Sequence, residues 1–213
     1  MKLEKFNNWP SDQTTKRLIY LGFIVLWINF PIIIYLLEIS HYPVSFLESQ
    51  LSFSGAVIKS HFKSMTAEQI YYYRLYQLSD DVYDFCYITM FFGLSLFLAR
   101  KFDADSSWRR SGFLIAILGL IGALCDITEN TFIIMMTFDP QGFPDIWAVA
   151  HSWFATFKFT LWGIQAVWII WADVKLLKKD ITTKKPFLAA IGIVASQHWP
   201  TVLTALGLLF GIA

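Results

Sequence analysis

Charged side chains occur inside long apolar runs of this sequence, where their burial is costly. Asp126 and Glu129 lie three residues apart within one such run, and Asn130 follows directly. Residues at positions i, i+3 and i+4 of a helix share a face, so these three side chains are expected to point the same way. Two carboxylates this close in a medium of low dielectric constant do not both ionise cheaply. We therefore expect one of them to be protonated or paired with a cation.

The next apolar run supplies a candidate cation, Lys158. At about 1.5 Å per residue, Lys158 and Asp126 lie at matching depths, roughly 17 Å from the same side of the bilayer. His151 precedes Lys158 by about two helical turns and is expected on the same side of its helix. We therefore predict Asp126, Glu129 and Lys158 as catalytic residues. The predicted substrate-binding residues are Asp84, Tyr87, Asn130 and His151.

Three further carboxylates, Asp80, Asp81 and Asp84, open the apolar run that precedes these two. Asp80 and Asp81 are expected to be solvated, because they fall at the outer end of that run. Asp84 lies one turn deeper and is the better candidate for the site. Ionisable groups within a membrane cost about 2.5–3.5 kcal/mol each on insertion scales, so each is expected to have a partner or a function.

The composition places these residues in a membrane protein. Of the 213 residues, 56% are hydrophobic and only 15% are charged, whereas soluble domains carry about a quarter charged residues. The net charge of +1 argues against a nucleic-acid partner, and membrane lipids are the expected neighbours. The two cysteines, Cys86 and Cys125, have no metal-ligand spacing and are expected to be buried and inert. We leave any metal or cofactor unassigned.

The apolar runs are long enough to cross a bilayer, whose hydrocarbon core takes roughly 20 helical residues. We predict an all-α, polytopic integral membrane bundle of about five transmembrane helices that forms a single domain over residues 1–213. The predicted spans are 18–37, 82–99, 112–137, 147–172 and 187–213. The first run is too long for the apolar region of a cleaved signal peptide and is interpreted as an uncleaved span.

The segment 39–80 is expected outside the membrane as a loop with an amphipathic helix. Thr66 and Gln69 have the spacing of a capping box, which predicts that a helix begins there. That helix either lies in the outer interface or runs directly into the second span. The stretch 43–53 before it is predicted to form an outside lid or a re-entrant segment.

The positions of Lys and Arg predict the orientation of the spans. Basic residues are dense in the leader, in the connection after the second span and in the connection after the fourth. The connection 138–145 has none, and the first connection carries only Lys59, Lys63 and Arg74. This alternation predicts a cytoplasmic N-terminus and an external C-terminus in a multi-pass protein of the cell membrane, most simply a bacterial inner membrane.

Three short motifs resemble those of a widespread group of small bacterial polytopic membrane proteins of uncharacterised function. The motifs are an Asp-x-x-Tyr stretch at 80–83 or 84–87, Asp-x-x-Glu-Asn at 126–130 and Phe-x-x-x-Lys at 154–158. The resemblance covers roughly residues 66–165. It implies a shared site and no particular activity.

Three classes of function fit these residues. The first is an enzyme that uses Asp126 and Glu129 for acid–base chemistry on a lipid or isoprenoid-like substrate, with Lys158 stabilising negative charge. The second is a proton-coupled transporter or channel component, which would need to form a homo-oligomer. The third is a noncatalytic partner, immunity or sensor protein. A buried salt-bridge network that only fixes helix packing is the structural alternative.

Two variants of these readings involve a bound group. A metal site would take Asp84, Asp126, Glu129 and His151 as ligands, although no sequence spacing typical of metal sites supports it. A Schiff base between a retinal-type molecule and Lys158 would use Asp126 as counter-ion.

Overall fold

The computed structural model describes residues 3–179, and every regular element in this range is helical. Four of the helices are long and apolar enough to cross a membrane: α1, α4, α5 and α6. The fifth predicted span, 187–213, lies outside the described residues. In chain order the elements are the 3-10 helix η1 (Leu3–Asn7), α1 (Asp12–Ser40), α2 (Phe46–Gln50), α3 (Gly55–Lys63), α4 (Ala67–Ala99), α5 (Ser107–Phe138) and α6 (Asp145–Lys179).

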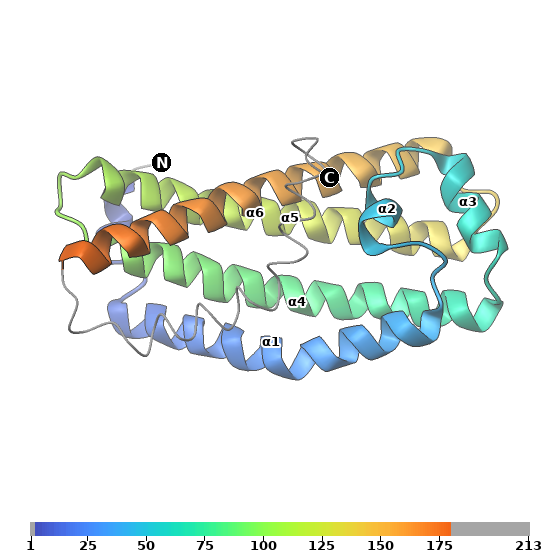
Figure 1. Ribbon diagram of the computed structural model, residues 1–213, viewed down its shortest axis with the longest axis horizontal. Helices are drawn as coiled ribbons and strands as arrows, with labels where there is room; N and C mark the ends of the chain where they lie inside the picture. The colour runs from blue at the N-terminus through green and yellow to red at the C-terminus, as the bar shows by residue number, and fades with distance from the viewer. Residues whose placement is uncertain (1–2, 180–213) are drawn as a thin grey trace.

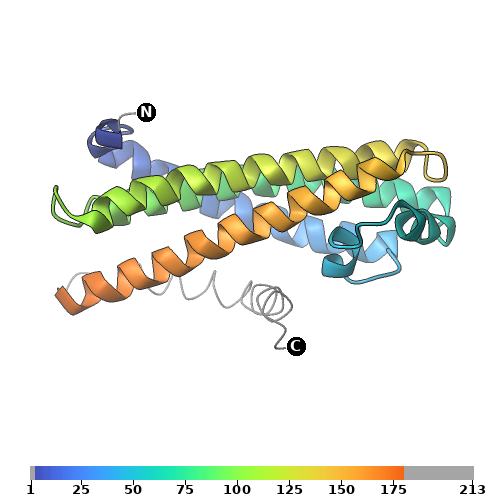
Figure 2. The same cartoon turned by 90° about the horizontal axis from the view of Figure 1, so that it is seen from above.

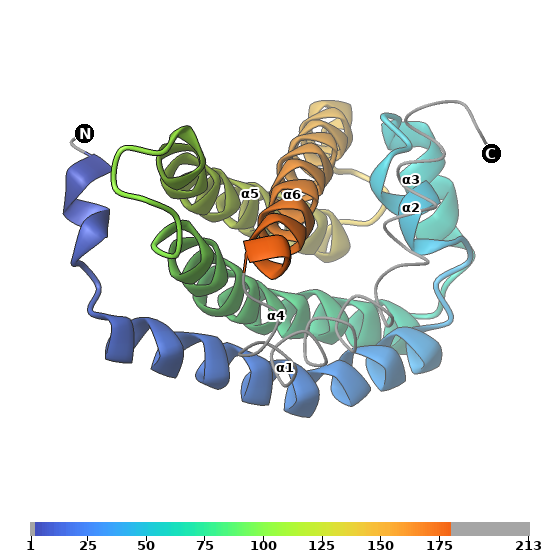
Figure 3. The ribbon, with the colours of Figure 1, turned by 60° about the vertical axis from the view of Figure 1, so that its left-hand side comes forward.

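The four long helices run side by side along the long axis, each roughly antiparallel to the next in the chain (Figure 1). Helix α4 packs against α1 on one side and against α5 on the other, and α5 packs against α6. Figure 3 shows α4 between α1 and the α5–α6 pair. This order places the charged segments of α4, α5 and α6 next to one another.

The short helices α2 and α3 gather at one end of the bundle, beside the connection between α5 and α6 (Figure 2). We call this the α2–α3 end. The opposite end carries η1 and the connection between α4 and α5. Arg100 fixes that opposite end, since its guanidinium donates to the carbonyl oxygens of Phe6 and Pro10 and pairs with Asp12.

Helix α4 begins well before the span predicted from hydropathy. Thr66 caps it, and the capping box is complete: Gln69 N donates to Thr66 Oγ1 at 3.2 Å, and Thr66 N donates to Gln69 Oε1 at 2.8 Å. The helix then continues without interruption to Ala99, so the predicted helix and the second span are one element. Asp80 consequently lies about 20 Å inside α4 rather than at the start of a span.

Close helix contacts depend on small residues where α5 meets α6. A Cβ atom at Gly122 would lie 2.8 Å from the Trp162 ring, and one at Gly119 would lie 2.3 Å from Gln165 Nε2. Gln165 also donates to Ser95 Oγ at 3.1 Å, which links α6 to α4. These contacts hold the three helices at fixed depths relative to one another, and this registration positions the buried polar side chains.

Candidate functional site

A buried ion-pair triad joins α5 to α6. The Lys158 ammonium of α6 pairs with Asp126 Oδ1 and with Glu129 Oε2, both from α5. All three side chains are at most 3% exposed. The spacing of Asp126 and Glu129 turns both carboxylates toward α6, and Lys158 at the same depth bridges them. The convergence expected from helical periodicity is therefore observed for these three residues.

His151 extends this triad toward the α2–α3 end. Its Nδ1 lies 3.4 Å from the backbone carbonyl oxygen of Glu129, its hydrogen-bond partner, and 3.3 Å from Glu129 Oε1. Its Nε2 lies 3.4 Å from the carbonyl oxygen of Ser49 in α2. Both ring nitrogens thus face oxygen atoms, whereas a neutral imidazole has a single N–H to donate. The His151 ring thus packs beside the Glu129 carboxyl group, whose Oε1 has no hydrogen-bond partner among the described residues.

Helix α4 adds carboxyl groups to the other side of the triad. Asp80 is 9% exposed and Asp84 is fully buried, while Asp81 is half-buried. Asn130 of α5 donates through Nδ2 to Asp81 Oδ1 at 3.1 Å and to Asp80 Oδ2 at 3.5 Å. The expectation that Asp80 is solvated is wrong, because α4 extends beyond it and packs against α5. Asp81 is also partly withdrawn from solvent.

Asp84 occupies an unusual position among these groups. Its carboxyl group interacts with that of Asp126, and neither of its oxygens receives a hydrogen bond from a described residue. Asn130 Oδ1 is likewise buried without a partner in the described part of the chain. Two buried carboxyl groups that repel each other do not both ionise cheaply, so the Asp84–Asp126 pair is a place at which the site can hold a proton.

The buried acidic groups outnumber the buried cation. Within residues 3–179, Asp80, Asp84, Asp126 and Glu129 are buried, and Lys158 is the buried lysine that faces them. A single ammonium compensates one carboxylate, and an uncompensated charge in a low-dielectric interior costs several kcal/mol. The cluster therefore has to hold protons or attract another cation.

Aromatic rings surround the ammonium of Lys158. The ring centroids of Phe159, Phe46 and Trp162 lie 5.1, 5.8 and 5.9 Å from Nζ. Tyr87 stacks on Trp162 with centroids 4.3 Å apart. The structure thus places Tyr87, a predicted substrate-binding residue, against the aromatic shell. Phe46 shows that α2 covers the triad, which is consistent with the expected lid.

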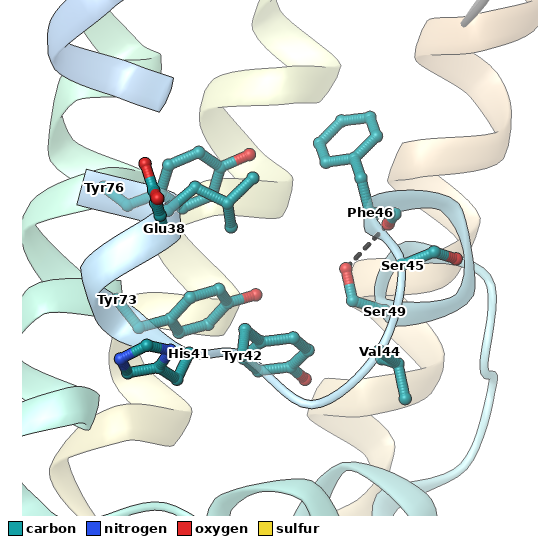
Figure 4. A pocket seen from close by; sticks show the side chains of 10 residues that line it. Glu38, His41, Tyr42, Val44, Ser45, Phe46, Ser49, Tyr73 and Tyr76 are labelled. Carbon is teal, nitrogen blue, oxygen red and sulfur yellow. Dashed lines mark hydrogen bonds between the residues drawn. The ribbon is translucent and has the colours of Figure 1, made fainter. Parts of the chain in front are cut away.

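A pocket of about 290 Å³ lies beside the cluster at the α2–α3 end (Figure 4). Three of its lining residues also reach the cluster: Phe46 lies over Lys158, Ser49 contacts His151, and Tyr76 precedes Asp80 by one helical turn. The lining residues are Leu37, Glu38, His41, Tyr42, Val44, Ser45, Phe46, Ser49, Tyr73 and Tyr76. The seven residues predicted as catalytic or substrate-binding are not part of this lining. The pocket therefore borders the predicted site at Phe46 and Ser49 and is not lined by it.

Among residues 3–179, no group of three or more His, Cys, Asp and Glu side chains has the arrangement of a metal site. Lys158 stands between Asp126 and Glu129, where a metal ion would need both carboxylates as ligands. The residues therefore do not fit the metal-dependent variant. Cys86 is buried as expected, whereas Cys125 is only half-buried.

Comparisons with known proteins add no assignment to this geometry. No family model, curated protein or solved structure matches this chain.

Proposed function

We propose that the chain is an integral membrane protein with its N-terminus on the cytoplasmic side and the α2–α3 end outside. The distribution of basic residues supports this orientation: Arg100 and Arg109 flank the connection at the η1 end, and the α5–α6 connection has none. The cluster then lies in the outer half of the bilayer. The fifth span over 187–213 stays a prediction from sequence.

We further propose that the site carries out acid–base chemistry on a lipid or isoprenoid-like substrate. The observation that supports this most directly is the contact between pocket and cluster through Phe46, Ser49 and Tyr76. A substrate in the pocket would be separated from the acid–base groups by the side chains of one short helix, α2. Because α2 has only five residues, its displacement is a small conformational step.

In this mechanism each polar residue has a distinct task. Glu129 delivers or accepts the proton, and His151 is its reservoir at a distance of 3.3 Å. Lys158 stabilises negative charge that develops on the substrate, and the rings around it exclude water and strengthen that interaction. Asn130 and Asp84 offer the unpartnered oxygens through which a substrate is oriented.

Proton-coupled transport is the second candidate, and the surplus of buried carboxyl groups favours it. A transporter needs groups that gain and lose protons as partners change, and the Asp84–Asp126 pair and the Glu129–His151 pair provide two such places. The two candidates differ in where the proton of Glu129 goes. In the enzyme it is transferred to or from a substrate atom, and in the transporter it moves along a pathway across the membrane.

One experiment separates them. The purified protein is incubated in nanodiscs made from the lipid extract of the host membrane, and lipid composition is followed by mass spectrometry, with Glu129→Gln as the matched inactive variant. We expect a lipid species to change with the native protein and to stay constant with Glu129→Gln. The transporter predicts a different result: the lipids stay unchanged, and proteoliposomes that contain a pH-sensitive dye acidify only when Glu129 is present. That result would contradict the enzyme and support the transporter.

A further inference from the structure

We propose that the pocket at the α2–α3 end binds a protonated amine, the head group of an amine-bearing amphiphile. This inference rests on the proposed function only in taking the pocket as the entrance to the cluster. The pocket lining and the neighbouring cluster determine the charge and hydrogen-bonding character of the ligand.

The lining offers acceptors for N–H donors on opposite sides. Tyr73 and Tyr76 point their hydroxyl groups from α4 into the pocket, and Ser49 and Phe46 face them from α2 (Figure 4). Glu38 adds a carboxylate from the last turns of α1. An ammonium group has three donors and no acceptor, so hydroxyl oxygens and a carboxylate match it.

The charge of the lining also favours a cationic ligand. It contains one carboxylate, that of Glu38, and neither lysine nor arginine. An anionic phosphate or carboxylate head group would have no positive partner there, whereas recognition of such groups generally relies on Arg or Lys. Aromatic rings also favour a cation, through the attraction between a positive charge and the ring face.

The cluster beside the pocket reinforces this preference. Lys158 compensates one negative charge, so the four buried carboxyl groups keep an acidic surplus, to which Asp80 and Asp84 on α4 contribute. Tyr76 lines the pocket and precedes Asp80 by one turn of α4. A cationic head group placed against Tyr76 would supply the positive charge that the buried carboxyl groups lack.

The volume sets the size of the group that enters. A pocket of about 290 Å³ is at the lower limit of ordinary small-molecule sites, so it accommodates a head group and the first carbons of a chain. The remaining hydrocarbon of an amphiphile would stay in the bilayer.

The test measures binding and needs no knowledge of the reaction. The protein in a nonionic detergent is titrated at pH 7 with n-octylamine, 1-octanol or sodium octanoate, and heats are recorded against detergent alone. We expect saturable binding of n-octylamine and at least tenfold weaker binding of the neutral and anionic analogues. Glu38→Gln and the double variant Tyr73→Phe/Tyr76→Phe should each weaken n-octylamine binding at least tenfold.

Two further variants serve as controls. Val44→Trp fills the pocket from its lining and should abolish saturable binding, whereas Glu68→Gln changes an exposed carboxylate of α4 outside the pocket and should leave binding unchanged. Equal binding of the octanol or octanoate, or unchanged n-octylamine binding in both Glu38→Gln and Val44→Trp, would overturn the inference. If the amine binds and no lipid is turned over, this inference holds and the proposed enzymatic function is contradicted.

Discussion

At the scale of residues, the cluster raises the question of whether Lys158 serves stability or chemistry. Lys158 is buried and paired with two carboxylates, so replacing it leaves negative charge without compensation. A buried pair that loses one partner typically costs about 3–5 kcal/mol, whereas removal of both charges is often nearly neutral. Stability and activity therefore have to be measured on the same variants.

We expect Lys158→Met to lower the free energy of unfolding by about 3–5 kcal/mol, because Asp126 then keeps an uncompensated charge. Adding Asp126→Asn should restore most of this loss, since both charges of the pair are then absent. The measurement is thermal unfolding in detergent, with Lys175→Met as a control for an exposed lysine of α6. Equal destabilisation of the single and double variants would show that charge pairing does not determine the effect.

Glu129→Gln tests the chemical role separately. The amide keeps the shape of the side chain and can still accept a hydrogen bond from Lys158, but it no longer titrates. We therefore expect a stability within about 1 kcal/mol of the native protein and a loss of activity of at least a hundredfold, the lower range for an acid–base residue. Growth complementation, or lipid turnover in nanodiscs, gives the activity. If Glu129→Gln and the Lys158→Met/Asp126→Asn double variant both remain fully active, the cluster only fixes helix packing.

The residues of the triad could be predicted because their signals are local and periodic. The spacing of Asp126 and Glu129 places them on one helical face. Lys158 was predicted as their partner because it lies at the same depth in the next apolar run. The involvement of Asp80 could not be predicted in the same way, because hydropathy placed the start of the second span at residue 82. The capping box at Thr66 was the signal that α4 begins earlier, and it implies the burial of Asp80 once α5 packs beside it.

At the scale of elements, the apolar cores of four spans were predicted and their ends were not. The helices extend beyond the apolar runs, as in α1, which covers Asp12–Ser40 against a predicted 18–37. Polar residues at helix ends lower hydropathy without interrupting the helix, and caps such as Ser11 rather than hydropathy set the boundaries. The position of α2 over the triad depends on a contact between His151 and Ser49, which are 102 residues apart, so no local pattern reveals it.

Helix α3 offers a prediction about pH. His61 is buried there, and its Nδ1 lies 3.2 Å from the hydroxyl oxygen of Tyr42, a residue of the pocket lining. Burial lowers the pKa of His61 below its ordinary value of 6.5, and the nearby Glu48 only partly opposes this shift. A histidine whose pKa is lower in the folded state stabilises that state above its unfolded pKa, and the contribution is lost as the pH falls through 6.5 toward the lower folded value.

We therefore expect α3 to lose protection from hydrogen exchange as the pH falls below about 6.5. His61→Gln, which stays neutral and can still accept from Tyr42, should remove most of this dependence. Hydrogen exchange has to be corrected for its intrinsic pH dependence, and His41→Gln is the matched exposed control. Protection that rises on acidification would contradict the assigned direction.

At the scale of the whole molecule, the two ends of the bundle differ in charge and in structure. The η1 end is held by arginines that bind the leader: Arg100 contacts Phe6 and Pro10, and Arg109 Nε donates to Asn7 at 2.8 Å. The α2–α3 end contains the pocket and the short helix α2, whose Phe46 ring lies 5.8 Å from Lys158 Nζ. A protein that meets its ligand at the outer face needs this second end outside, and the orientation is therefore part of the functional proposal.

Orientation can be tested at two exposed positions, Gln141 in the α5–α6 connection and Asp105 in the α4–α5 connection. With Cys86 and Cys125 replaced by Ser, we expect Gln141→Cys to react with a membrane-impermeant maleimide in intact cells. Asp105→Cys should react only after permeabilisation, because the basic residues around it predict that its connection lies in the cytoplasm. Labelling of both positions in intact cells would mean that α5 does not cross the membrane. The opposite pattern would place the pocket in the cytoplasm and exclude an entrance from the outer leaflet.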